Sequence, residues 1–138
     1  MPLLVWNEKM ETGIKSMDDQ HQYWVLLMNH LHDTLQVMVD KTVAEQALMG
    51  ILKYTRVHFA DEERLLLENN YPDYASHKKL HDDFVSQINE LKKSIEQGKQ
   101  SDWRSVLEVI NIMSRWLKDH IQGADQKYAS FLKEKGAN

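Results

Sequence analysis

Apolar residues recur at helical spacing along four stretches of the chain. Few helix-breaking residues interrupt these stretches, since the 138 residues include only five glycines and two prolines. There is no alternating period-two pattern and no Asn-Gly or Asp-Gly hairpin signal, so strands are not expected. The four stripes are Trp24, Met28, Leu31, Leu35 and Met38; Ala47, Leu48, Ile51, Thr55 and Leu65; Phe84, Ile88, Leu91 and Ile95; and Val106, Ile110, Met113 and Leu117.

The four stripes and the short connections between them predict one all-α domain covering the whole chain, residues 1–138. The first helix is expected to begin at a cap within residues 16–19, and residues 101–102 (Ser-Asp) are expected to cap the fourth. A short helix from Asp125 to about Lys135 closes the chain. The predicted fold is an up-down-up-down four-helix bundle with an N-terminal arm and a short C-terminal helix.

Composition excludes several functional classes. Hydrophobic residues are 42% and charged residues 28% of the chain, values typical of a soluble domain. The formal net charge of −4 gives no basic footprint for nucleic acid or an anionic membrane. Without cysteine, the chain has no disulfide framework, thiolate metal site or thiol nucleophile. No signal peptide or membrane-spanning run is visible, so we expect a cytoplasmic protein.

Five of the seven histidines fall on the apolar faces of the expected helices. In an antiparallel bundle, residues equally far from a turn lie at the same height. Counting from turns expected near residues 41, 71 and 100 places these histidines and Glu62 at one end of the bundle. The pairs His58/Glu62 and His77/His81 have i, i+4 spacing, which puts both side chains on one helix face. The five histidines are His21, His58, His77, His81 and His120.

Such a cluster favours a metal centre. Buried imidazole and carboxylate groups are costly unless they are paired or bind a metal. A single histidine on an apolar face is usually a hydrogen-bonded core residue, but five at one height with a glutamate are hard to explain that way. More than four such ligands suit iron or another octahedral first-row ion, whereas a structural zinc takes four. The ferritin-like di-iron class is disfavoured because the chain has no Glu-x-x-His pair.

Longer motifs connect these residues across nearly the whole chain, from Trp6 to Tyr128. They are Gly13-Ile14, Asp18-x-Gln20-His21, His58-Phe59-x-x-Glu62-Glu63, Tyr71-Pro72-x-Tyr74-x-x-His77-x-x-x-His81, and Trp116-Leu117-x-x-His120-Ile121-x-x-x-Asp125-x-x-Tyr128. This pattern resembles the hemerythrin family, specifically the bacteriohemerythrin-type single domains. The resemblance implies a centre of two non-haem iron ions with a bridging oxo or hydroxo group. The implied ligands are His77, His81 and His120 for one iron, His21 and His58 for the other, and Glu62 and Asp125 as bridges.

Asp125 is nominated by the resemblance alone. It lies five residues after His120, about 140° around an ideal helix. The helix must therefore break or bulge near Gly123 if both side chains are to reach one centre. The alternative is that Asp125 only caps the last helix.

The resemblance also implies a site for a small ligand. Five imidazoles, two bridging carboxylates and a bridging solvent oxygen leave one coordination position open, on the two-histidine iron. Trp24 lies one turn from His21, where a smaller aliphatic residue is commoner, and we expect it to narrow access. His30 and His32 match no ligand position and are expected at or near the surface. The side chains expected around the ligand are Trp24, Phe59, Trp116, Leu117 and Tyr128.

The leading function is therefore reversible oxygen binding, as a carrier or store, by a protein that is not primarily an enzyme. A sensor of oxygen, redox state or nitric oxide is an alternative, which the expected lone domain disfavours. An enzyme handling peroxide or nitric oxide would need a proton relay, and no further carboxylate or histidine is expected at that level. Within residues 61–64 only Glu62 is expected to face the interior. We expect a monomer that binds dioxygen and neither nucleic acid nor membrane; a protein partner for oxygen delivery is left open.

Overall fold

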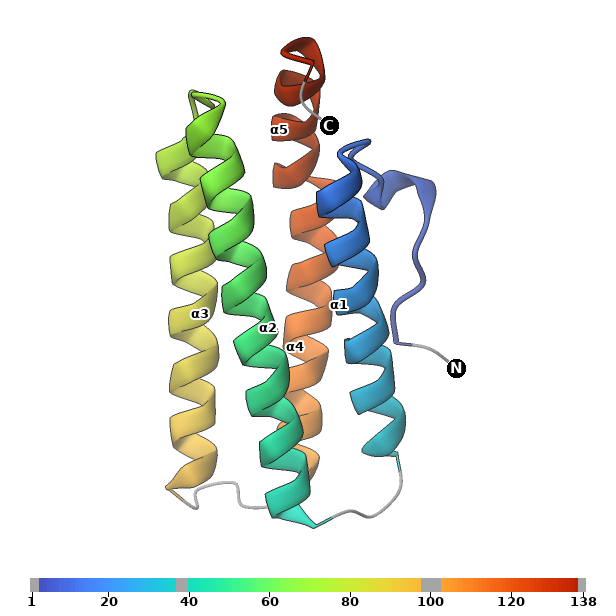
Figure 1. Cartoon of the computed structure of the whole chain (residues 1–138). Helices are drawn as coiled ribbons and strands as arrows, with labels where there is room; N and C mark the ends of the chain where they lie inside the picture. Colours follow the sequence, from blue (N-terminus) through green and yellow to red (C-terminus); the bar gives the residue numbers. More distant parts are fainter. Residues whose placement is uncertain (1–2, 37–39, 98–102, 137–138) are drawn as a thin grey trace.

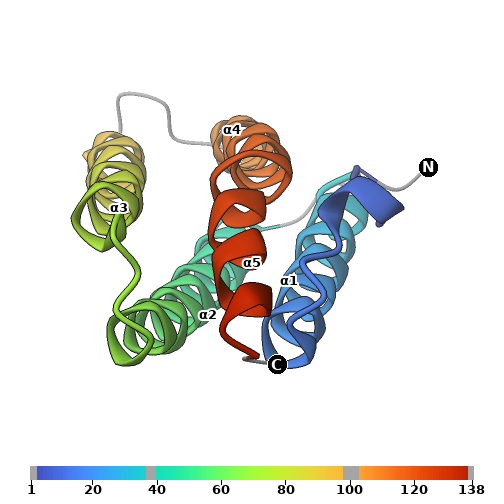
Figure 2. The ribbon, with the colours of Figure 1, turned by 90° about the horizontal axis from the view of Figure 1, so that it is seen from above.

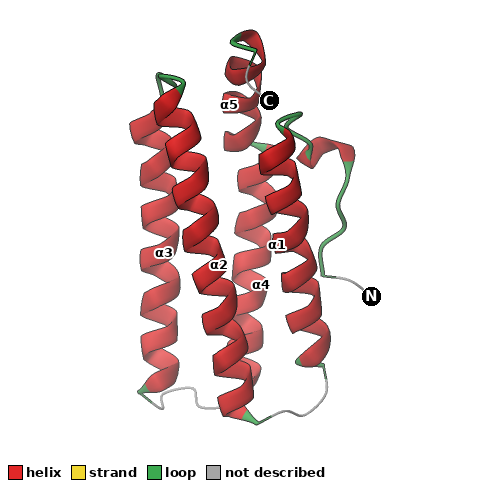
Figure 3. Cartoon of the chain, in the orientation of Figure 1, coloured by secondary structure: helices red, strands yellow, loops and turns green. Residues whose placement is uncertain are grey.

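The computed structural model describes residues 3–36, 40–97 and 103–136, and all regular structure in these ranges is helical (Figure 3). A short 3-10 helix, η1 (Glu8–Met10), lies in the N-terminal arm. The predicted all-α fold is confirmed, whereas Met38, Ser101 and Asp102 lie outside the described residues. The α-helices are α1 (Lys15–Thr34), α2 (Lys41–Glu68), α3 (Tyr74–Glu96), α4 (Trp103–Gln122) and α5 (Ala124–Glu134).

The four long helices run alternately up and down (Figure 1). Each contacts the next along the chain, and α4 closes the ring by contacting α1. Seen from above, α5 leads away from α4 and crosses the end of the bundle toward α1 and α2 (Figure 2). The N-terminal arm is fixed beside α1, because the Asn29 side chain exchanges two hydrogen bonds with the backbone of Leu4. No described helix is long and apolar enough to cross a bilayer.

Two apolar clusters fill the interior. The larger lies among the four long helices and includes Trp24, Phe59, Phe84 and Leu117. Fully burying one such side chain contributes roughly 1.5–3 kcal/mol. The smaller cluster lies where α5 meets the ends of α1 and α2, and it consists of Ile14, Met17, Leu66, Tyr71, Tyr128 and Leu132.

A polar layer separates the two clusters. On α1, Met17 belongs to the smaller cluster and Trp24 to the larger, and His21 lies between them. On α2, Glu62 likewise lies between Phe59 and Leu66. Because α1 and α2 pass from one cluster to the other at the same height, His21 and Glu62 face a common interior space.

The first helix begins differently from the expectation. It starts at Lys15, after Ile14, which makes no side-chain capping bond. The carboxylate of Asp18 instead accepts hydrogen bonds from the Thr12 amide (2.8 Å), the Thr12 hydroxyl (2.7 Å) and the Gly13 amide (3.1 Å). Gly13 has φ +79°, a left-handed conformation that glycine adopts at little cost. The acidic residue therefore holds the arm against the first turn.

The predicted break near Gly123 is present. α4 ends at Gln122 and α5 begins at Ala124, with Gly123 at φ −112° and ψ −86° between them. A Cβ at Gly123 would lie only 2.9 Å from the Asp119 carbonyl oxygen, so the break needs glycine. The alternative interpretation of Asp125 as a helix cap is wrong: the cap position is Gly123, and Asp125 is buried in the first turn of α5.

Candidate metal centre

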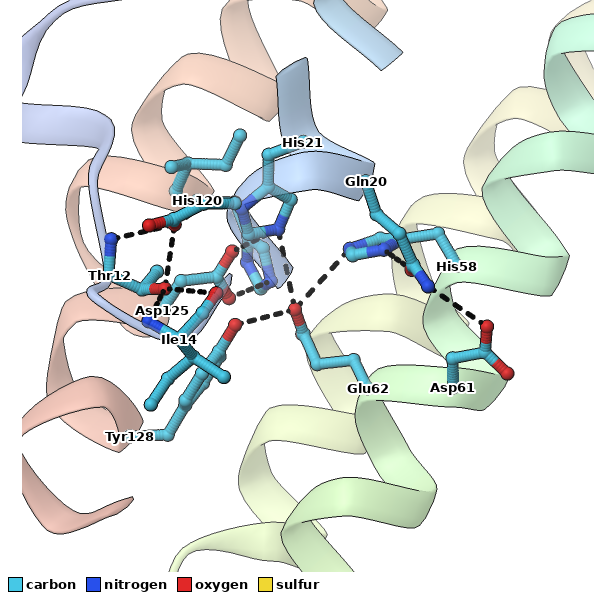
Figure 4. A network of polar contacts seen from close by, with 12 residues as sticks. Thr12, Ile14, Gln20, His21, His58, Asp61, Glu62, His120, Asp125 and Tyr128 are labelled. Atoms are coloured by element: carbon cyan, nitrogen blue, oxygen red, sulfur yellow. Dashed lines mark hydrogen bonds and ion pairs between the residues drawn. The ribbon is translucent and has the colours of Figure 1, made fainter. Parts of the chain in front are cut away.

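All seven side chains predicted as ligands meet in the polar layer between the two clusters. None is more than 7% exposed. Five of them are labelled in Figure 4, where the helices bring their polar atoms toward one another. His21 comes from α1, His58 and Glu62 from α2, His77 and His81 from α3, His120 from α4, and Asp125 from α5.

Six of the seven residues place their potential metal-binding atoms in two groups, each with all members within 4.8 Å of one another, and Asp125 is in neither group. Glu62 belongs to both groups. The resemblance to hemerythrins divides the five histidines in the same way. The three-histidine group is Glu62, His77, His81 and His120, and the two-histidine group is His21, His58 and Glu62.

The two oxygens of Glu62 face different groups. Oε2 lies 3.4 Å from His21 Nε2 and 3.3 Å from His58 Nε2. Oε1 lies 2.7 Å from His77 Nε2 and 3.1 Å from His81 Nε2. One carboxylate therefore reaches both groups at once, the arrangement that a bridging ligand requires.

Asp125 has the same arrangement. Its Oδ2 lies 3.2 Å from His21 Nε2, in the two-histidine group. Its Oδ1 lies 3.2 Å from His77 Nε2 and 3.1 Å from His120 Nε2, in the three-histidine group. The break at Gly123 thus aims this carboxylate into the same space as Glu62.

Several of these nitrogen and oxygen atoms lack hydrogen-bond partners, and this bears on whether the seven residues fit a metal cation. Among the described residues, both ring nitrogens of His21 and both oxygens of Asp125 are buried without a hydrogen bond. Of these four atoms, all but His21 Nδ1 lie within ion-pair distance of a neighbour in the cluster. Leaving such groups unpaired costs roughly 1–3 kcal/mol each. Atoms that lie close together yet do not bond to one another are expected where their lone pairs face a shared cation. Five imidazoles with two carboxylates fit non-haem iron.

In the metal-free cluster the carboxylates and the imidazoles shift one another's pKa values in opposite directions. Burial acts to raise the pKa of Glu62, but hydrogen bonds from the surrounding histidines hold it well below its ordinary value. Burial and the charge of Glu62 act to raise the pKa of Asp125, but His120 and His21 hold it below its ordinary value. Burial acts to lower the pKa of His21 and of His77, but the two carboxylates raise each to about 9. Burial also acts to lower the pKa of His81, but Glu62 and Glu63 raise it. At pH 7 protonated imidazoles, His21 and His77 among them, therefore face the two carboxylates.

His58 behaves differently from His21 and His77. Burial is the largest influence on it and keeps its pKa below the ordinary value of 6.5, in spite of the nearby Glu62. Its ring is therefore neutral at pH 7, as a metal-binding imidazole must be.

Two of the imidazoles are backed by polar groups that residue spacing did not predict. Glu63 was expected to face solvent, but its Oε2 lies 2.8 Å from His81 Nδ1. Gln20 Oε1 lies 2.6 Å from His58 Nδ1, and Gln20 Nε2 donates to Asp61 Oδ2 at 3.1 Å (Figure 4). The expectation that no further carboxylate reaches this level is therefore wrong. Residues on either side of Glu62 lie at the edges of its helix face, so their proximity depends on how closely α1 and α3 approach.

Aromatic rings surround the cluster. The Trp24 ring is 5.4 Å from the His58 ring, and Phe59 stacks on His81 with centroids 3.8 Å apart and planes 3° apart. Trp116 stacks on His120 at 4.2 Å, and Leu117 is fully buried nearby on α4. On the opposite side, the Tyr128 hydroxyl donates to Glu62 Oε2 at 2.9 Å. His30 is exposed and His32 half-buried, apart from the cluster as expected.

Comparison with known proteins gives a consistent result. Residues 12–132 match the family model described as the hemerythrin HHE cation binding domain. The chain is 36% identical over 134 residues to a bacteriohemerythrin of Stenotrophomonas maltophilia, covering 96% of this chain and 84% of that protein. It is 28% identical over 127 residues to a myohemerythrin of Theromyzon tessulatum, covering 92% of each chain.

The fold also matches that of a solved hemerythrin structure. A crystal structure of wild-type hemerythrin superposes with a TM-score of 0.81 at 27% identity, covering 93% of this chain and 96% of that one. The family model and the 36% identical relative each span most of the chain. On these grounds, together with the buried histidine and carboxylate cluster, this chain belongs to the hemerythrin family.

Proposed function

We propose that this chain holds two iron ions and binds dioxygen reversibly, as an oxygen carrier or store. The observation that carries the proposal is the position of Glu62 and Asp125. Each carboxylate has one oxygen near the two-histidine group and its other oxygen near the three-histidine group. Relatives named bacteriohemerythrin and myohemerythrin support it. The residues that would hold the iron are His77, His81 and His120 on one side, His21 and His58 on the other, and Glu62 and Asp125 between them.

Iron held by these residues would supply reversible two-electron chemistry toward dioxygen. The protein's own part is to keep the donor atoms in place and the space dry. Within the described residues the two-histidine group offers one imidazole fewer than the other group. We therefore place the small-ligand position on that side, next to Trp24 and the His58 ring.

The surroundings of the two-histidine group favour binding over turnover. An amide, Gln20, stands behind His58, and the rings of Trp24 and Phe59 pack nearby. None of these groups is an acid that readily gives up a proton. A dry pocket with such groups next to His58 slows the proton-assisted loss of reduced oxygen species, so the oxygen can leave unchanged.

The test is to load metal-free protein with ferrous iron under anaerobic conditions and measure iron content and absorbance. We expect about two irons per chain, a colourless reduced protein, a pink colour on adding oxygen, and bleaching when oxygen is removed. A content of one metal per chain, or a colour that oxygen produces but its removal does not reverse, would contradict the proposal. Turnover with peroxide or nitric oxide at a rate far above oxygen release would favour the enzyme alternative.

A further inference from the structure

Two of the histidines that face Glu62 are backed by different chemical groups. His81 Nδ1 lies 2.8 Å from the carboxylate oxygen Oε2 of Glu63. His58 Nδ1 lies 2.6 Å from the amide oxygen Oε1 of Gln20. The opposite nitrogens, Nε2 of His81 and of His58, lie 3.1 Å and 3.3 Å from Glu62. The three-histidine group thus has an anionic partner behind one ring, and the two-histidine group has a neutral one.

The hydrogen-bond network sets the direction of both bonds. An ionised carboxylate can only accept, so His81 Nδ1 donates to Glu63. The Gln20 amide nitrogen donates to Asp61 Oδ2, so the Gln20 oxygen faces His58 Nδ1 and accepts a hydrogen bond from it. Both rings therefore keep a proton on Nδ1 and present Nε2 to the metal side.

The His81 ring has a packing contact of its own besides its hydrogen bond with Glu63. Phe59 stacks flat on the His81 ring at 3.8 Å and holds its plane independently. The Glu63 side chain is 16% exposed and borders a cleft between α2 and α3 that Asp82 and Glu90 also line. Lys78 Nζ, at 3.9 Å from Glu63, is 42% exposed and is hydrogen-bonded to Asp82, so it offsets the Glu63 charge only weakly.

We propose that Glu63 is a positioning residue that makes the three-histidine group the tighter of the two metal positions. The inference rests on the proposed function, since it presupposes two metal positions. A charge-assisted hydrogen bond is roughly twice as strong as a neutral one, and a carboxylate behind an imidazole raises its basicity as a ligand. The first divalent ion taken up therefore occupies the three-histidine group, and the second occupies the group backed by Gln20.

The experiment is a Co²⁺ titration of metal-free protein in competition with a chromophoric chelator, which yields two stepwise binding constants. Glu63→Gln keeps the shape and one acceptor oxygen but removes the charge, and Glu63→Ala also removes the hydrogen bond. We expect the first constant to fall about tenfold in Glu63→Gln and up to about 100-fold in Glu63→Ala, with the second nearly unchanged. Glu90→Gln removes the same charge from the same cleft, farther along α3, and should change neither constant.

A variant that keeps only one intact metal position shows which binding constant belongs to which histidine group. His21 belongs only to the two-histidine group. His21→Ala should therefore bind one Co²⁺ with a constant close to the first constant of the unchanged protein. Adding Glu63→Ala to this background should lower that one constant by the same factor. The absorption bands of the first Co²⁺ should shift in Glu63→Gln. Cooperative urea unfolding of the metal-free variants should show that they remain folded.

The outcomes separate this inference from the proposed function. If the unchanged protein binds fewer than two Co²⁺ ions, the proposed two-metal centre fails. If it binds two and Glu63→Ala leaves the first constant unchanged, or lowers only the second, the inference about Glu63 fails while the two-metal centre stands. Equal losses in Glu63→Gln and Glu90→Gln would reduce the effect to general surface charge and would likewise overturn the inference.

Discussion

The Tyr128 hydroxyl on α5 donates a hydrogen bond of 2.9 Å to Glu62 Oε2 on α2. Burial, and then the charges of Glu62 and Asp125, raise the pKa of Tyr128 well above its ordinary value. The hydroxyl therefore stays protonated and remains a donor. The hydrogen bond ties the short last helix to the carboxylate that both histidine groups share.

Replacing this donor should weaken the metal-free fold. In Tyr128→Phe a buried carboxylate loses a hydrogen bond, and bonds to charged groups contribute about 1.5–3 kcal/mol. We expect the free energy of unfolding to fall by about that amount in urea denaturation, with the iron content still near two. Tyr23→Phe, at a residue that is 48% exposed, is the control and should stay within about 0.5 kcal/mol of the parent.

Iron content should distinguish histidines in the cluster from those outside it. His77→Ala removes one donor of the three-histidine group, and Glu62→Ala removes the carboxylate shared by both groups. Both variants should contain clearly fewer than two irons after loading. His30→Ala changes an exposed residue on α1 and should keep full iron content. Two irons in the His77 or Glu62 variant, by metal analysis, would remove those residues from the ligand set.

Metal uptake should strengthen as the pH rises toward 9. In the metal-free protein the two carboxylates raise the pKa values of His21 and His77 to about 9, although burial acts to lower them. At pH 7 both rings carry a proton that a metal ion must displace. The apparent affinity should therefore rise about tenfold per pH unit for each displaced proton until the pH reaches that pKa. Calorimetry in buffers of different ionisation enthalpy should show proton release; affinity independent of pH between 6 and 8 would contradict the prediction.

The same groups should make the metal-free fold pH-sensitive in the opposite direction. A histidine whose folded pKa is raised stabilises the fold below its unfolded pKa, here 6.5, and loses this contribution as the pH rises through about 9. The free energy of unfolding of metal-free protein should accordingly be smaller at pH 9.5 than at pH 6.5. Metal-loaded protein, in which the protons have been displaced, should not show this loss, and parallel urea titrations of the two forms provide the comparison.

Two glycine substitutions should have opposite effects. In Gly123→Ala the new Cβ would lie 2.9 Å from the Asp119 carbonyl oxygen, so the backbone must shift and move Asp125 with it. We expect a loss of about 1–3 kcal/mol in stability together with weaker metal binding. Gly50→Ala, where a Cβ meets nothing within 4 Å in the middle of α2, should instead stabilise by roughly 0.5–1 kcal/mol. Thermal unfolding of both variants tests the pair, and a neutral Gly123→Ala would show that the break does not need glycine.

Trp24 should limit access to the two-histidine side. Its ring is 1% exposed and packs 5.4 Å from His58 and 5.6 Å from Phe59. Trp24→Phe keeps an aromatic ring but frees space, and a barrier about 1 kcal/mol lower corresponds to about a fivefold faster rate. We expect the oxygenated colour to decay in air about fivefold faster, with unchanged iron content. Leu26→Ala, 63% exposed on the same helix, should decay at the parent rate, and a Trp24 variant that does the same would assign the ring to packing alone.

The periodicity of the chain was enough to predict the helices and the clustering of the five histidines with Glu62. Residues spaced three or four apart share a helix face in any bundle, so His58 with Glu62 and His77 with His81 could be placed on inner faces from spacing alone. Helix lengths then put donors from different helices at one height. Asp125 did not follow from these rules, because its direction depends on a break whose angle the residues near Gly123 do not specify by themselves.

Only the tertiary structure decided which groups stand behind the imidazoles. Glu63 and Asp61 flank Glu62 at the edges of its helix face, where spacing cannot tell a buried side chain from a solvated one. Their contacts with His81 and Gln20 arise because α3 and α1 pack closely against α2 at this height. Periodicity is a property of one helix, whereas these contacts depend on the distance and rotation between two. For this reason the sequence by itself determined which histidines, with Glu62, lie at one level of the bundle, and the packing of the helices determined their hydrogen-bond partners.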